Sequence, residues 1–150
     1  MFIAKTLHIL AAVIWVGGMF FAYMALRPVA ASQLEPPQRL SLWDGVFTKF
    51  FFWVWLSIIT ILLSGYHMMF SAFGGFAGSG MHIHLMHGMG LVMMLLFLHV
   101  YFAPYKRLKR EVAQGNFPEA GKQLNMIRKL VAINMTIGLL TFVAAESVLI

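Results

Sequence analysis

Apolar residues are concentrated in four long runs, separated by segments that are basic or rich in glycine. Each run is long enough to cross a hydrocarbon core as an α-helix, which needs about 20 residues. The pattern predicts an all-α integral membrane protein, a single domain built as a bundle of four transmembrane helices. The predicted spans cover residues 3–26, 50–70, 82–103 and 130–150. Linkers over residues 27–49 and 104–129 and a glycine-rich loop over 71–80 join them, and we expect Pro28 and Pro104 to mark helix ends.

The composition is typical of an integral membrane protein. Hydrophobic residues make up 61% of the sequence and charged residues 11%, and the mean hydropathy is +0.82. The net charge of +6 would suggest nucleic-acid binding in a soluble domain, but in a membrane protein such an excess normally lies in cytoplasmic loops. Nucleic acid is therefore not an expected partner, whereas the lipid bilayer is.

The distribution of the basic residues predicts how the chain is oriented. Ten of the eleven lysines and arginines lie in the two linkers, and the glycine-rich loop has none. By the positive-inside rule the linkers face the cytoplasm, so both termini lie on the periplasmic side of a bacterial inner membrane in this multi-pass protein. The second linker could also bind anionic lipid, although a topology signal is the favoured interpretation.

Five of the six histidines fall near the predicted outer face, where an ionisable residue inside a span suggests a functional site. His8 and His87 each lie about five residues inside their spans and could face one another as the axial ligands of a haem b. Gly90, one turn below His87, would leave room for the porphyrin, and Lys5 could meet a propionate. His67 and His84 are the next ligand candidates. The chain has no cysteine, so such a haem would be held non-covalently.

Copper is the alternative cofactor. Thioether and imidazole groups form the soft ligand set that Cu(I) prefers, and both are abundant near the outer face. Twelve methionines in an apolar chain are also consistent with ordinary packing. The candidate copper ligands are His67, Met68, Met69, His82 and His84.

His99 stands apart from the other histidines. It lies twelve residues after His87, about 18 Å further along the same helix. No other histidine is expected at that depth, so we expect a buried hydrogen bond from His99 to Asn134 or to a backbone carbonyl.

The first span reads T-L-H-I-L-A-A-V-I-W-V-G-G, and it resembles the opening helix of the copper resistance protein D (CopD) family and of HemJ, the membrane protoporphyrinogen oxidase. His8, Trp15 and Gly18 carry this likeness, and Leu91-Val92 followed by His99-Val100-Tyr101 resembles the third helix of HemJ. The resemblance implies a four-helix bundle that binds haem b in the HemJ branch or takes up copper in the CopD branch. Gly88 stands where HemJ has a lysine, so haem binding is expected rather than porphyrinogen oxidation.

These observations predict a haem b protein of the inner membrane that works in electron transfer or oxidoreduction, with its haem between the first and third spans. A copper-binding or copper-transport protein is the alternative, and a non-catalytic subunit of a larger membrane complex is another. The sequence identifies neither catalytic residues nor a redox partner. A homodimer or a larger complex is compatible with the small-residue faces of the helices.

Overall fold

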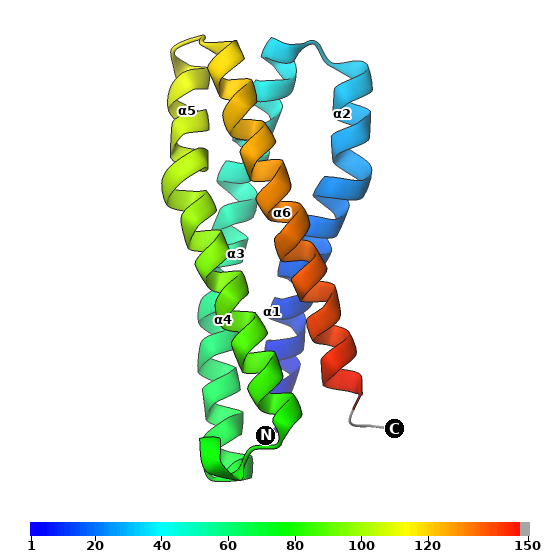
Figure 1. Cartoon of the computed structure of the whole chain (residues 1–150), viewed down its shortest axis with the longest axis vertical. Coiled ribbons are helices and arrows are strands. Elements are labelled where there is room, and N and C mark those ends of the chain that lie inside the picture. The colour runs from blue at the N-terminus through cyan, green and yellow to red at the C-terminus, as the bar shows by residue number, and fades with distance from the viewer. Residues whose placement is uncertain (148–150) are drawn as a thin grey trace.

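The structure, a computed structural model, describes residues 1–147 as four long helical segments packed into one bundle (Figure 1). Each segment is long and apolar enough to cross a membrane, which confirms the predicted all-α, four-span class. The described elements are α1 (Phe2–Phe21), a π-helical turn (Ala22–Leu26), α2 (Arg27–Gln33), α3 (Pro36–Phe73), a 3₁₀ turn (Phe76–Gly78), α4 (Met81–Val100), a second π-helical turn (Tyr101–Tyr105), α5 (Lys106–Ala113) and α6 (Phe117–Glu146). The last three residues of the predicted fourth span, 148–150, lie outside the described residues.

The two prolines predicted to end helices do not end them. Pro28 lies in the first turn of α2, and α1 and α2 form one continuous helical segment through the π-helical turn that precedes it. Pro104 lies inside the second π-helical turn, which joins α4 to α5. A π-helical turn is wider than an α-helical one and can accept a residue that would otherwise disturb the hydrogen-bond ladder. The first and third helical segments therefore extend beyond the predicted spans.

The bundle has two ends with different chemistry. One end holds the start of α1, the turn between α3 and α4, and the last residues of α6, at the bottom of Figure 1. Five histidines lie toward it, and we call it the histidine end. The other holds the α2–α3 and α5–α6 connections and ten of the eleven basic residues, and we call it the basic end.

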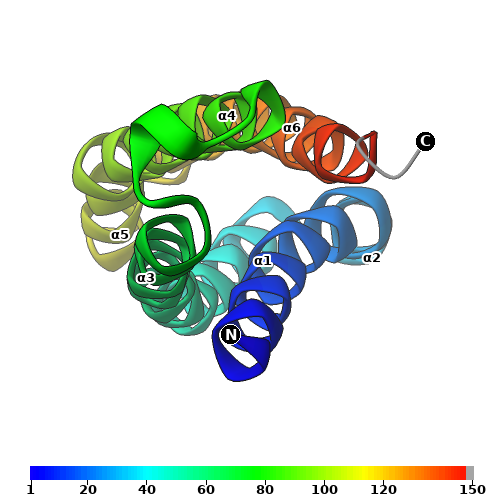
Figure 2. The same ribbon diagram turned by 90° about the horizontal axis from the view of Figure 1, so that it is seen from below.

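Seen from the histidine end, α1 and α3 lie side by side, and α4 and α6 pack across them (Figure 2). An aromatic cluster joins α3 to α4 and to the π-helical turn that follows it. The centroid of the Phe51 ring lies 5.3 Å from that of the Phe97 ring and 4.9 Å from that of the Tyr105 ring, and both pairs are edge-on. Large apolar side chains cover much of the outer surface, for example Leu63 at 70% exposure and Leu95 at 66%. Such a surface is stable where lipid, rather than water, surrounds it.

Candidate metal site at the histidine end

His8 projects from α1 onto α3 and is half-buried there. Its Nδ1 lies 3.0 Å from Ser64 Oγ, and its ring lies directly against Gly65, where an added Cβ would come within 3.1 Å of His8 Cε1. Gly65 therefore allows the imidazole to approach the α3 backbone closely.

The hydrogen bonds around Ser64 fix the tautomer of His8. The Ser64 hydroxyl also lies within hydrogen-bond distance of the Thr60 carbonyl, which can only accept. The single hydroxyl proton therefore goes to Thr60, and Ser64 accepts from an Nδ1–H on His8. This arrangement leaves the Nε2 lone pair of His8 available, as in a histidine whose second nitrogen is oriented for metal binding.

His87 also contacts α3, through a different side chain. Its Nε2 lies 3.0 Å from the Tyr66 hydroxyl, and its ring packs edge-on against Tyr66 and Phe76 at centroid distances of 5.7 and 5.4 Å. Ser64 and Tyr66 are two residues apart on α3, about 200° around the helix axis. The structure therefore brings His8 and His87 to different sides of α3 rather than to each other.

Most of the remaining predicted site residues lie near the α3–α4 turn. His67 is exposed on α3, and His84 is exposed and stacks on Phe76 with centroids 6.4 Å apart. His82 is half-buried and its ring packs against Gly80. The other predicted site residues differ in exposure. Lys5 is exposed, Met68 and Gly90 are half-buried, and Met69 is buried. A Cβ added at Gly90 would meet nothing within 4 Å, so the space beside it is open.

Within residues 1–147, no three histidine or acidic side chains come close enough together to hold one metal ion. A metal bound at this end would therefore need thioether ligands or a lower coordination number. Copper(I) accepts both, since it prefers soft sulfur ligands.

One face of α4, which the sequence pattern alone does not single out, supplies such thioethers. His82, Met86, Met89 and Met93 follow one another at spacings of four, three and four residues, which places them on one face of the helix. The first three are half-buried and Met93 is 4% exposed, so this face leads from the histidine end into the core. We call it the methionine face. The helical spacing was visible in the sequence, but only burial separates this face from the other methionines.

The expected hydrogen bond between His99 and Asn134 is not formed. Asn134 Nδ2 instead donates to the backbone carbonyl of Met93 at 3.2 Å, and His99 is exposed. His99 comes six positions after Met93, which turns it about 120° around the helix axis from the α6 side, and this explains the failed prediction.

Comparison with known proteins gives one match. Residues 44–148 match the family model described as Copper resistance protein D, and this match begins within α3, includes α4 to α6, and leaves out α1 with His8. No curated protein sequence and no solved structure matches the chain. The match bears out the CopD part of the resemblance seen in the sequence, whereas HemJ is not shown and haem binding gains no support. The chain is a multi-pass membrane protein related to copper handling, and it belongs to the copper resistance protein D family.

Proposed function

We propose that the protein binds Cu(I) at its histidine end and conducts it into the bundle along the methionine face of α4. The observation that carries this proposal is the methionine face itself, in which a histidine near the surface is followed by two half-buried thioethers and then a buried one. Soft thioether and imidazole ligands suit Cu(I), and the family match relates the chain to copper.

The side chains around the α3–α4 turn would bind Cu(I) first, at the surface. His67, Met68, Met69, His82 and His84 all lie there, and His67 and His84 are exposed. We place this end on the periplasmic side of the bacterial inner membrane, because the basic residues gather at the other end. Copper would then arrive from the periplasm.

The core offers a continuation of the path beyond Met93. Val16 of α1 and Met93 of α4 both contact the position of Gly138 on α6, so the three helices meet at this level. Met19 and Met135 each come three residues, about one turn, nearer the basic end on α1 and α6, and both are buried. Exchange of Cu(I) between successive thioethers needs no change of oxidation state and no added reductant.

Competition for Cu(I) against a chromogenic chelator tests the proposal on the purified protein. The double variant Met86→Leu, Met89→Leu removes two thioethers and keeps the volume nearly constant, so the fold should survive. We expect its affinity for Cu(I) to fall at least ~10-fold, equivalent to about 1.4 kcal/mol.

The matched control is the double variant Met24→Leu, Met126→Leu. Both residues are exposed methionines, at 53% and 42%, outside the methionine face. The control should bind Cu(I) as the wild type does. Equal affinity in all three proteins would overturn the role of the methionine face.

Haem b ligated by His8 and His87 is the second candidate. The free Nε2 of His8 and the open space beside Gly90 support it. His87 would have to release Tyr66, and the two histidines would have to turn from different sides of α3 toward one iron. A Soret band in the purified protein that disappears in His8→Ala but persists in the exposed control His99→Ala would favour haem, and a colourless protein after growth with added haem would exclude it.

A further inference from the structure

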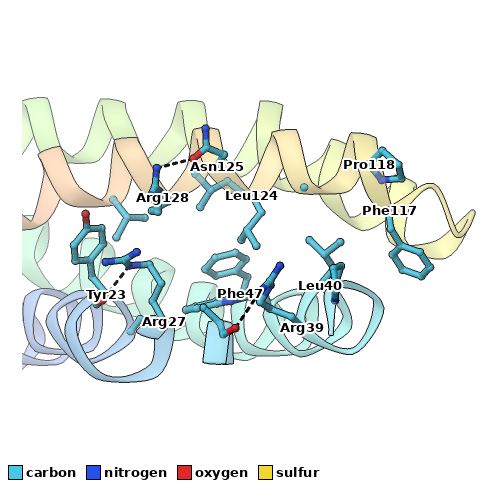
Figure 3. Close-up of a pocket in the computed structure, with 17 residues that line it drawn as sticks. Tyr23, Arg27, Arg39, Leu40, Phe47, Phe117, Pro118, Leu124, Asn125 and Arg128 are labelled. Atoms are coloured by element: carbon cyan, nitrogen blue, oxygen red, sulfur yellow. Dashed lines mark hydrogen bonds between the residues drawn. The ribbon is translucent and has the colours of Figure 1, made fainter. Parts of the chain in front are cut away.

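A cavity of about 370 Å³ opens at the basic end, opposite the histidine end. It lies between the α1–α2 segment, the first half of α3 and the first half of α6 (Figure 3). Arg27, Arg39 and Arg128 line it, one from each of these three segments. Figure 3 shows Arg27 and Arg39 on the side of α1–α3 and Arg128 on the opposite wall, which α6 forms.

The three arginines have no carboxylate partner within residues 1–147. The ion pairs described there join Lys109 to Asp44, Arg110 to Glu111 and Lys122 to Glu119, none of which lines the cavity. All three cavity arginines are half-buried. No acidic side chain of the described residues lines the cavity, so the positive charge of the three guanidinium groups is uncompensated there.

The hydrogen bonds within the protein occupy only some of the N–H donors of each guanidinium group. Arg27 Nε donates to the Tyr23 carbonyl at 3.3 Å, with the guanidinium 4.5 Å from the centre of the Tyr23 ring. Arg39 Nη1 donates to the Ala31 carbonyl at 3.4 Å, and Arg128 Nη2 donates to Asn125 Oδ1 at 2.7 Å. A guanidinium has five N–H donors, so each arginine retains several for a ligand. Planar forks of this kind bind phosphate oxygens in pairs.

Most of the rest of the wall is apolar. Leu40, Trp43 and Phe47 of α3 face the cavity together with Ile127 and Val131 of α6. A small hydrated anion would gain nothing from these side chains, whereas an acyl chain would bury its surface against them. The lining therefore fits an amphiphile that has an anionic head and an apolar tail.

The depth of the cavity matches the headgroup region of a bilayer. Arg27 follows the apolar run of the first span, and Arg128 comes two residues before the apolar run of the fourth. The π-helical turn Ala22–Leu26 adjoins the cavity, and Ala22 and Tyr23 within it form part of the wall. Such turns occur frequently at functional sites.

We propose that this cavity binds an anionic phospholipid, with its phosphate held by Arg27, Arg39 and Arg128 and an acyl chain along Trp43, Phe47 and Val131. Basic pockets between membrane helices on the cytoplasmic side are suited to such headgroups. The site is separate from the proposed copper-capture groups, which lie at the opposite end of the bundle.

Native mass spectrometry of the detergent-purified protein tests the proposal. Phosphatidylglycerol and phosphatidylcholine, with the same acyl chains, are titrated in separate arms, and inorganic phosphate is titrated in a third. We expect phosphatidylglycerol to bind one per chain at least ~10-fold more tightly than phosphatidylcholine, since its net charge lets the arginine contacts outweigh desolvation. Arg39→Gln and Arg128→Gln should each weaken that binding at least ~10-fold.

Arg107→Gln is the matched control, because Arg107 is an exposed arginine of the same end that does not line the cavity. It should leave binding unchanged. Equal binding of the two lipids, or equal loss in the control, would overturn the site. If inorganic phosphate binds, neither lipid does, and the arginine variants lose the phosphate, the cavity binds a soluble anion and the lipid proposal is overturned. If one variant fails to elute as a folded protein, the other still decides the result.

Discussion

Gly138 lies where three helices meet, and replacing it with alanine should measurably loosen the bundle. A Cβ at this position would come within 2.7 Å of Val16 Cγ2 on α1 and 3.1 Å of Met93 Cε on α4. Ordinary van der Waals contact begins near 3.4 Å, so α1 and α6 would have to separate by about 0.7 Å at this level. Val16 is buried, and a β-branched side chain in a helix has essentially one χ1 rotamer, so it cannot turn away.

The cost follows from overpacking a closed interface, which typically amounts to about 1–3 kcal/mol. Part of this is offset, because alanine favours a helix over glycine by up to about 1 kcal/mol. The control Gly17→Ala has the same helix-propensity gain, and its Cβ would meet nothing within 4 Å. We therefore expect Gly138→Ala to be about 1–3 kcal/mol less stable than Gly17→Ala.

Unfolding of the purified protein in mild detergent, followed by tryptophan fluorescence over a denaturant series, measures this difference. Adding Val16→Ala to Gly138→Ala removes the two methyl groups that clash and should restore part of the loss, as a favourable coupling of about 1 kcal/mol. Equal stability of the two glycine variants would refute the close packing of α6 against α1, and so would a double variant without coupling.

Three further substitutions, one of them with a control variant, test other contacts. Tyr66→Phe removes the hydroxyl that bonds His87, and we expect a loss of about 0.5–1.5 kcal/mol in the same unfolding assay; an unchanged stability would contradict that bond. Glu111→Gln should cost about 1–3 kcal/mol and expose the α5–α6 turn to protease, because the buried carboxylate accepts from Arg110 and Asn116, while Glu119→Gln, at a more exposed pair, should change little. Asn134→Leu should leave stability unchanged or raise it, since the Oδ1 of this buried amide has no partner within residues 1–147, and a loss above about 2 kcal/mol would disprove this reasoning.

The sequence was sufficient to predict the four spans and the gathering of five histidines toward one end. Apolar run length sets the number of crossings, and position along each run sets depth, so both can be read without knowing how the helices pack. Helix continuity was harder to predict. Pro28 and Pro104 are ordinary helix breakers in a sequence, and the neighbouring π-helical turns that accommodate them leave no clear sequence signal.

Side-chain partners depend on how each helix is rotated about its axis, which the sequence does not specify. His8 and His87 were therefore expected to face each other, whereas the structure directs one to Ser64 and the other to Tyr66 on α3. The failed pairing of His99 with Asn134 has the same origin. The arginine cavity could not be predicted either, because its three charges come from segments far apart in the chain.

Copper K-edge absorption spectroscopy of the Cu(I)-loaded protein tests the central claim most directly, because it reports which atoms surround the metal. Binding along the methionine face predicts sulfur together with nitrogen in the first shell of the wild type. The sulfur contribution should fall in Met86→Leu, Met89→Leu and remain in Met24→Leu, Met126→Leu. A protein that retains no copper, or a first shell of nitrogen and oxygen alone, would contradict the account.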